Sequence, residues 1–186
     1  MNTRVIEKAF QPLYGQSCWG LNYERQLNLS MNFGKPSLDV REPFKTDSKS
    51  EIAQRIAASR RVTVHGEWWL WITRCWWRLT SDDLGVTTDS CSLRRIERAT
   101  RQLDGQKLVS VGVVPQTGAT SFVFDLGCVL HCRRFERDDD AELWILYKPS
   151  GYVLSVHGNG TFCHQRSTKA GERLQPINGG LHPDRR

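Results

Sequence analysis

The sequence predicts a single α+β domain made mainly of antiparallel β-sheet, as an open sheet or a partly open barrel with two helices. Three observations lead to this prediction. Residues 15–44 and 105–135 share a similar pattern of three short strands, helical patterns separate them, and 39% of the 186 residues are hydrophobic. A chain of this length and composition can bury one sizeable core. We place the folded domain at residues 1–164 and a flexible tail at residues 165–186.

The two β-rich segments begin in the same way and keep the same order of features. Each opens with Gly-Gln, at Gly15 and at Gly105, and continues with strands in which alternate residues are apolar. Such alternation between turn residues is typical of half-buried strands. Each segment then passes a glycine and reaches a third short strand, which contains Leu38 and Val40 in the first segment and Leu130 and Cys132 in the second. The shared order predicts a duplicated three-stranded β-unit.

A first helix is predicted over residues 49–59, between the two β-units. Ser48 and Glu51 have the spacing of a capping box, in which each side chain satisfies a free backbone N–H of the first turn. Apolar residues then recur at helical spacing, so one face of this helix is predicted to be buried. That face contains Ile52, Ala53, Ile56 and Ala57.

Residues 67–79, with the sequence EWWLWITRCWWRL, are predicted to form one long strand. Aromatic and β-branched side chains fit the pleated surface of a sheet. Alternation places Trp69, Trp71, Cys75 and Trp77 on one face, which we expect to face the core. The opposite face carries Trp68, Leu70, Ile72, Arg74, Trp76 and Arg78.

A second helix is predicted over residues 92–103, and a three-stranded meander over residues 143–164. The helix has an apolar face, and Gly105 is well placed to end it because glycine tolerates the left-handed conformation. The buried face is predicted to contain Leu93, Ile96, Thr100 and Leu103. Pro-Ser-Gly and Gly-Asn-Gly sequences supply the turns of the meander.

Charge and cysteine content limit the classes of protein to consider. The net charge is +6, but much of the excess lies around the first helix and in the C-terminal segment. A nucleic-acid footprint is normally one continuous basic face, so the charge alone is weak support for such a partner. The N-terminal sequence lacks a secretory pattern and no stretch is apolar enough to span a membrane, so we expect a cytoplasmic protein in which most of the six cysteines are reduced.

The most unusual candidate site is the end of the Trp-rich strand. Arg74, Trp76 and Arg78 alternate there, so two guanidinium groups flank one indole on the same face. Such a patch can stack a nucleobase or hold an anionic partner. Alternatively, the two arginines cover the ring at the rim of the sheet. Arg94 and Arg98 of the second helix are additional candidate binding residues.

No motif for catalysis, phosphate binding or metal binding is present. The sequence lacks a nucleophile elbow and a glycine-rich phosphate loop. Several potential metal ligands are close in sequence, but on strands Cys128 and Cys132 would point away from His131, which does not suit a tetrahedral zinc site. The remaining members of that group are Cys163 and His164. We expect no cofactor and no metal, and favour a non-enzymatic protein, although a catalytic site assembled from separate loops stays open.

Three short patterns carry a resemblance to a known family. They are Tyr14-Gly15-Gln16, the stretch from Phe122 to Leu130, and the stretch from Trp144 to Gly151. They resemble small β-rich bacterial proteins of unknown function, some of which look like immunity proteins of toxin systems. The resemblance spans residues 13–44 and 103–164, and it implies a fold but no catalytic residues.

We therefore expect a module that binds another protein, with an immunity-like or regulatory role. Trp and Arg are enriched at the energetic centres of protein interfaces, and the Trp-rich strand supplies both. Immunity proteins against nucleases are often acidic, whereas this chain is basic, so its target need not be a nuclease. The alternative is a nucleic-acid-binding protein that uses the Arg/Trp patch and the arginines of the second helix.

Overall fold

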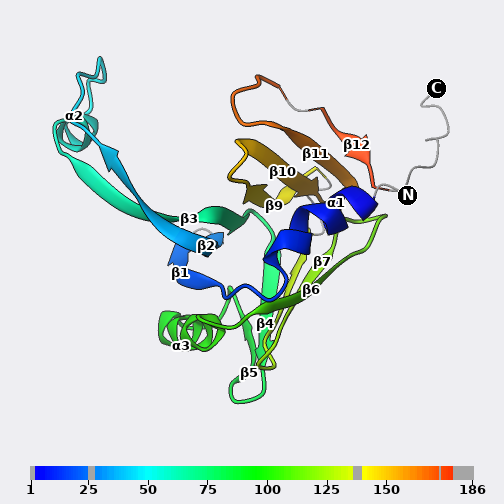
Figure 1. The fold of residues 1–186 in the computed structure, drawn as a ribbon. Coiled ribbons are helices and arrows are strands. Elements are labelled where there is room, and N and C mark those ends of the chain that lie inside the picture. Colours follow the sequence, from blue (N-terminus) through cyan, green and yellow to red (C-terminus); the bar gives the residue numbers. More distant parts are fainter. Residues whose placement is uncertain (1–2, 25–27, 136–139, 172, 178–186) are drawn as a thin grey trace.

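The computed structural model describes residues 3–24, 28–135, 140–171 and 173–177. They form two antiparallel sheets, and neither closes into a barrel (Figure 1). The seven-stranded sheet has the order β1 (Trp19–Glu24), β2 (Asn28–Arg41), β3 (Arg61–Ile72), β9 (Glu142–Tyr147), β10 (Tyr152–His157), β11 (Thr161–Arg166) and β12 (Gln175–Pro176). The five-stranded sheet has the order β5 (Gly85–Thr88), β4 (Trp76–Ser81), β8 (Val129–Arg133), β7 (Thr120–Phe124) and β6 (Leu108–Val113). The predicted α+β, mainly antiparallel class is confirmed.

Three α-helices are present in the described residues, one more than predicted. They are α1 (Thr3–Phe10), α2 (Glu51–Ala57) and α3 (Leu93–Leu103). A short 3-10 turn, η1 (Gln11–Leu13), follows α1. Helix α1 has only eight residues, and its buried side chains are Ile6, Ala9 and Phe10. Such a short helix is marginal by itself in water, so its stability comes from packing on the core.

The two sheets and helix α1 share one hydrophobic core. Trp144 of β9 lies at its centre, where its ring makes edge contacts with Phe10 of α1 at 5.4 Å and with Phe122 of β7 at 6.0 Å between centroids. The indole N–H donates a hydrogen bond of 2.8 Å to the hydroxyl of Thr120, so its polar atom is satisfied. Residues from both sheets belong to the same buried cluster. The described chain therefore has one interior rather than two.

The Gly-Gln segments each lead into an edge strand, and they lie beside each other. Ser17 and Lys107 form an antiparallel bridge, and the backbone N–H of Gly15 donates to the carbonyl of Leu108 at 2.8 Å. The segments continue into the meanders β1-β2-β3 and β6-β7-β8, which belong to different sheets. The prediction for residues 15–44 was wrong in one respect, because the expected third strand at Leu38 and Val40 is the outer half of β2. The third strand of that meander is β3.

The predicted long strand over residues 67–79 is in fact two strands in different sheets. Strand β3 ends at Ile72, and β4 begins at Trp76. Between them Arg74 has a φ of 31°, in the left-handed region that non-glycine residues rarely adopt. Thr73 anchors the break, since its hydroxyl donates to the carbonyl of Glu142 at 2.7 Å and its N–H donates to Leu143 at 3.0 Å. These contacts with β9 turn the chain out of the first sheet.

The break also reverses which residues face the core. The buried side chains are even-numbered in β3 and odd-numbered in the segment after the break; they are Trp68, Leu70 and Ile72, then Cys75, Trp77 and Leu79. Trp69 and Trp71 were predicted to be core residues, but they lie on the outer face of the sheet and are only partly buried. Side chains alternate between the two faces of a strand, so a break that contains an odd number of residues exchanges the two faces. A prediction based on one uninterrupted strand therefore assigns the residues of β3 to the wrong face.

The C-terminal meander was predicted correctly, whereas the start of the flexible tail was not. Strand β11 extends to Arg166, and β12 pairs with it through Phe162 and Gln175. Ile177 follows β12 and is completely buried. Its backbone N–H donates to the carbonyl of Gly160 at 2.9 Å. The described part of the predicted tail therefore belongs to the fold; residues 172 and 178–186 lie outside the described residues.

One buried cysteine, Cys18, predicts a dependence of stability on alkaline pH. Burial raises the pKa of Cys18 from 9.0 to about 12, and the Asp104 carboxylate adds to this shift. The folded protein therefore holds the thiol proton more tightly than the unfolded chain does. This contribution to stability is complete below pH 9 and is lost as the pH rises toward about 12.

We expect the free energy of unfolding to fall less between about pH 8 and about pH 10.5 in Cys18→Ala than in the wild type, because alanine has no thiol to ionise. Urea unfolding at both pH values measures this difference. Cys91→Ala is the control, since Cys91 is only partly buried. Identical pH dependence in the wild type and Cys18→Ala would contradict the prediction.

Candidate binding surfaces

Two of the five predicted site residues, Trp76 and Arg78, lie together on the outer face of the five-stranded sheet. Both side chains point away from the core, because the buried neighbours on β4 are Trp77 and Leu79. The guanidinium group of Arg133 on β8 lies 4.4 Å from the centre of the Trp76 ring, within the range of a cation–π interaction. The cation on Trp76 is thus Arg133, rather than Arg74 or Arg78, the two arginines that flank it in the sequence.

A histidine completes this basic face. His131 is directly opposite Arg78 in the register of β4 and β8, and its Nδ1 is 2.8 Å from the hydroxyl of Ser121. Burial, with a smaller contribution from Arg78, lowers the pKa of His131 below 6.5. The residues in register on this face of β4, β5, β7 and β8 include no carboxylate. We call Trp76, Arg78, His131 and Arg133 the basic sheet face.

The other three predicted site residues lie elsewhere. Arg74 is exposed at the break between β3 and β4, where it lines a hollow on the seven-stranded sheet. Arg94 and Arg98 are exposed on α3. Helix α3 lies on the core side of the five-stranded sheet, since Arg95 reaches the buried Thr87. The structure therefore does not bring Arg94 or Arg98 onto the basic sheet face.

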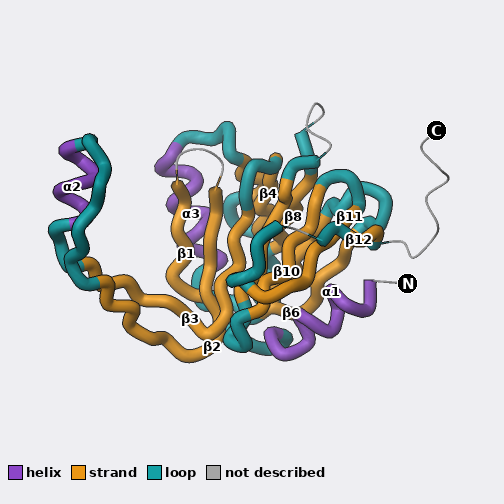
Figure 2. The backbone as a smooth tube through the Cα atoms, turned by 90° about the horizontal axis from the view of Figure 1, so that it is seen from above, coloured by secondary structure: helices purple, strands orange, loops and turns teal. Residues whose placement is uncertain are grey.

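The second candidate surface is a long arm formed by the outer halves of β2 and β3. Residues 36–66 extend away from the body of the molecule, with α2 at the far end (Figures 1 and 2). The arm begins at a shift in register between Phe33 and Pro36. At this point Asn32 accepts a hydrogen bond of 3.0 Å from the N–H of Gly66 through its side-chain oxygen, which anchors the base of the arm.

One face of the arm is apolar and uncovered. Leu38 is directly opposite Val64, and Val40 is directly opposite Val62, so the four side chains share one face. Leu38 is 68% exposed and Val64 is 51% exposed. The opposite face of the same strands is polar and carries Ser37, Asp39, Arg41, Arg61, Thr63 and His65. The arm thus has the alternation of a half-buried sheet, but the described chain leaves its apolar side in contact with solvent.

Helix α2 carries further exposed apolar side chains at the tip of the arm. The helix forms at the predicted place, but Ser50 rather than Ser48 is its cap and accepts a hydrogen bond from the N–H of Ala53. The predicted buried face is mostly exposed, since Ile52 is 68% and Ile56 48% exposed, and only Ala57 is buried within the helix. Within the described part of the chain, α2 lies at the end of the arm and away from the body of both sheets (Figures 1 and 2). We call Leu38, Val40, Val62 and Val64 the apolar arm surface. Phe44, Ile52 and Ile56 are further exposed apolar residues at the tip.

Polar contacts hold the tip in this form. Arg41 donates to the carbonyl of Ile56 at 3.1 Å, and its guanidinium group lies 5.3 Å from the centre of the Phe44 ring. The N–H of Phe44 donates to the carbonyl of Ala57 at 2.9 Å. Arg60 and Glu42 form an ion pair at 2.8 Å. These contacts fasten α2 to the ends of both strands.

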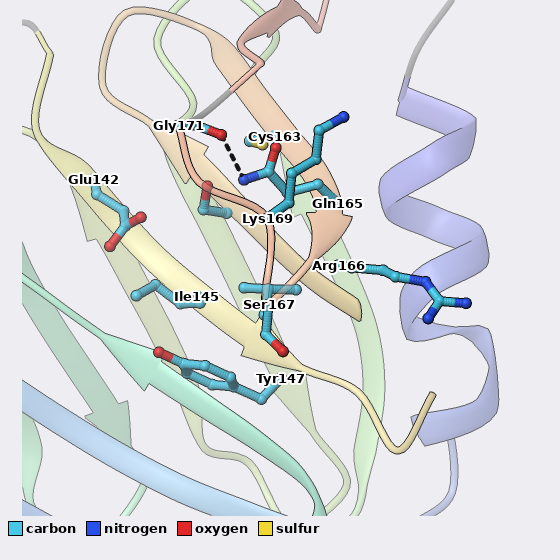
Figure 3. Close-up of a pocket in the computed structure, with 11 residues that line it drawn as sticks. Glu142, Ile145, Tyr147, Cys163, Gln165, Arg166, Ser167, Lys169 and Gly171 are labelled. Carbon is cyan, nitrogen blue, oxygen red and sulfur yellow. Dashed lines mark hydrogen bonds between the residues drawn. The ribbon is translucent and has the colours of Figure 1, made fainter. Parts of the chain in front are cut away.

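The third candidate surface is a cavity of about 270 Å³ on the outer face of the seven-stranded sheet. Figure 3 shows its wall of β9 residues, which includes Glu142 and Tyr147, and the turn formed by residues 167–171, which folds over the sheet. Gln165 of β11 holds this turn, because its side-chain amide donates to the carbonyl of Gly171 at 2.9 Å. The other oxygen-bearing side chains in the lining are Ser155 and Ser167.

Aromatic side chains adjoin this cavity. The Trp69 and Trp71 rings are stacked at 4.9 Å, and the Tyr147 ring lies 5.3 Å from Trp69. Burial, and then the Glu142 carboxylate, raise the pKa of the Tyr147 phenol, which therefore keeps its proton. Trp71 and Arg74 line a second hollow of about 520 Å³, which shares Glu142 and Ile145 with the first.

A serine–histidine contact lies in the floor of these hollows. The hydroxyl of Ser155 is 3.3 Å from Nε2 of His157, and the Nδ1 of that ring is 3.2 Å from the carbonyl of Asp140. Both side chains are buried. These contacts satisfy buried polar groups and keep the ring fixed between β10 and the segment before β9. We assign this pair a structural role.

No protein-family model, curated protein or solved structure matches this chain. None of the helices in the described residues is long and apolar enough to cross a membrane.

Proposed function

We propose that this protein is a non-enzymatic module that binds another protein through the apolar arm surface, in an immunity-like or regulatory role. The observation that carries this proposal is the pairing of Leu38 with Val64 and of Val40 with Val62 on an uncovered face. Each square ångström of apolar surface left in water costs about 25 cal/mol. A contiguous exposed apolar patch is a typical mark of an interaction site.

Beyond its base, the arm consists of two strands with no neighbouring strand among the described residues. An isolated two-stranded hairpin is marginally stable in water. Strand β1 pairs with β2 only up to Asn32, and β9 pairs with β3 only from Trp69 onward. The edges of the arm thus have no neighbouring strand among the described residues, and a partner could add one through backbone hydrogen bonds. A protein partner would supply both a cover for the apolar face and pairing for the edges.

The chemistry of the arm favours a protein over a nucleic acid at this face. The paired side chains are Leu and Val, which make no contact with phosphate, whereas nucleic-acid binding is dominated by Lys and Arg. The polar face of the arm carries both signs of charge, with Asp39 between Arg41 and the body of the protein. The surface lacks the uniform positive charge that nucleic acid requires.

The double variant Leu38→Asp/Val64→Asp tests this proposal. Two carboxylates in the centre of the apolar face would have to be desolvated in a complex, so we expect partner affinity to fall at least about 100-fold. The measurement is affinity purification from native lysate with mass spectrometry, followed by titration of the purified partner. Ser37→Asp/Thr63→Asp, on the polar face of the same strands, is the matched control and should retain binding.

The proposal fails if wild-type protein captures no partner. It also fails if both double variants bind the partner equally well. Circular dichroism of the two variants shows that each is folded before binding is compared.

A second function, nucleic-acid binding, is favoured by the basic sheet face. Arg78, Arg133 and Trp76 combine cations with an aromatic ring, as in single-strand binding surfaces. We expect a fluorescent oligonucleotide of single-stranded DNA to bind with an affinity that falls steeply with salt, because phosphate contacts release counterions. Arg78→Ala/Arg133→Ala should weaken binding, and Arg94→Ala/Arg98→Ala should not. Binding that does not depend on salt, or no binding at low salt, would exclude this second function.

A further inference from the structure

The cavity on the outer face of the seven-stranded sheet has the features of a small-molecule site that is separate from the arm. It is lined by β9, β10 and β11 and covered on one side by residues 167–171 (Figure 3). The cavity lies on the opposite face of the sheet from the core, since the core-facing residues of β9 and β10 include Leu146 and Leu154. A ligand can therefore enter from solvent without any rearrangement of the interior.

The lining contains an acceptor that no described residue satisfies. The side-chain oxygen of Gln165 is buried and has no hydrogen-bond partner in the described residues. Its orientation is fixed, because the amide nitrogen of the same side chain donates to Gly171. This oxygen is closed off from solvent here, so the turn of residues 167–171 has to move slightly before a ligand hydroxyl group reaches it. Leaving a buried acceptor unpaired costs free energy, which favours that movement when a donor is present.

The remaining lining selects the class of donor. The Glu142 carboxylate is an acceptor, and the hydroxyl groups of Ser155 and Ser167 act in either direction. The positive charges lie at the rim, since the Arg166 and Lys169 side chains point away from Glu142 and Tyr147 in Figure 3. A strongly charged ligand would meet charges of both signs here. Several hydroxyl groups on an uncharged ligand match these acceptors better.

The Tyr147 and Trp71 rings, tilted by 52° to each other, add apolar surface to these acceptors. Tyr147 lines the first hollow and Trp71 the second, on adjacent strands, and the two hollows meet at Glu142 and Ile145. Sugar rings present one face of C–H bonds, which packs on aromatic rings, and hydroxyl groups around their edge. A volume of about 270 Å³ is suited to one ring, and the adjoining hollow of about 520 Å³ accommodates further rings.

We propose that the groove formed by Trp71, Glu142, Tyr147 and Gln165 binds a short, uncharged oligosaccharide. Tyr147 and Trp71 pack against successive sugar rings, and the Gln165 oxygen and the Glu142 carboxylate accept hydrogen bonds from hydroxyl groups. The binding is independent of the arm and of the basic sheet face.

The test is a glycan array probed with the full-length protein, followed by calorimetric titration of the best-binding free trisaccharide. Tyr147→Leu removes the stacking ring, and Glu142→Gln removes the charge on an acceptor at nearly constant size. We expect each to weaken binding by about ten-fold or more. Trp76→Ala, on the outer face of the other sheet, is the matched control and should bind as the wild type does.

The failure of this proposal is distinct from failure of the arm proposal. Leu38→Asp/Val64→Asp should leave saccharide affinity unchanged, and Tyr147→Leu should leave partner affinity unchanged. The proposal is overturned if no glycan on the array binds. It is also overturned if Trp76→Ala weakens binding as much as Tyr147→Leu. A third contrary result would be tighter binding of tetramethylammonium than of the trisaccharide, because the aromatic rings would then form a site for an organic cation.

Discussion

Replacement of Trp144 by alanine is expected to lower the free energy of unfolding by about 3–5 kcal/mol, the largest effect that we expect from a single core substitution in this protein. The Trp144 side chain is completely buried and contacts Phe10 and Phe122, which come from α1 and β7. Its removal leaves a cavity between the two sheets and beneath α1. It also removes the hydrogen bond to Thr120.

Urea unfolding followed by far-ultraviolet circular dichroism measures this loss. Trp76→Ala is the matched control, because Trp76 lies on the outer face of the other sheet and contacts Arg133. That substitution removes mainly a partly exposed cation–π contact, so we expect a cost of about 1 kcal/mol. Equal losses in the two variants would show that Trp144 is not at the centre of a shared core.

Trp144→Phe separates the two contributions of this residue. Phenylalanine keeps an aromatic ring near Phe10 and Phe122 but cannot donate to Thr120. The free energy of unfolding of Trp144→Phe should lie between those of the wild type and of Trp144→Ala. The hydroxyl of Thr120 keeps its own bond to the carbonyl of Gly118 at 2.7 Å, so it is not left without a partner.

The strands that could be predicted from the sequence are those whose pattern is local. The C-terminal meander alternates apolar and polar residues and has Pro-Ser-Gly and Gly-Asn-Gly turns, and it forms as expected. The break at Arg74 could not be predicted in the same way. It depends on bonds from Thr73 to Glu142 and Leu143 on β9, which only the folded structure brings beside it. A single buried residue after a polar stretch, such as Ile177, is equally difficult to detect from local composition.

The candidate surfaces show a second limit of prediction from periodicity. Alternation correctly indicated that Leu38 and Val40 share an apolar face, and helical spacing did the same for Ile52 and Ile56. Periodicity states that a face is apolar, but it does not state that the same chain covers that face. The prediction therefore treated Ile52 and Ile56 as buried and placed Leu38 and Val40 on a half-buried strand, whereas the structure leaves all four exposed on the arm.

The basic sheet face was predicted in part for a related reason. Trp76 and Arg78 are two residues apart on one strand, so their shared face is a local property. Arg133 and His131 join them through the register of β4 with β8, which is a long-range property. Alternating basic residues on the strand 129–133 were a usable signal, but only with that pairing known.

Gly118→Ala is expected to have the other large effect, because Gly118 lies where the two sheets meet. This glycine precedes β7 and has a φ of 65°, and a Cβ placed on it would lie 2.2 Å from the carbonyl oxygen of His157 on β10. A side chain at this position must therefore push β10 away from the loop before β7. A neighbouring contact makes such movement difficult, since the N–H of Gly118 is itself bonded to the carbonyl of Val114 at 2.8 Å.

Gly151→Ala is the control that isolates this close contact. Gly151 has a similar φ of 73°, but a Cβ there would meet no atom within 4 Å. Both substitutions carry the cost of a left-handed conformation, about 1–2 kcal/mol. Gly118→Ala should cost about 1–3 kcal/mol more, because the new methyl group also overpacks the junction. Urea unfolding of the two variants gives the difference directly, and equal losses would mean that the sheets are not in close contact at this point.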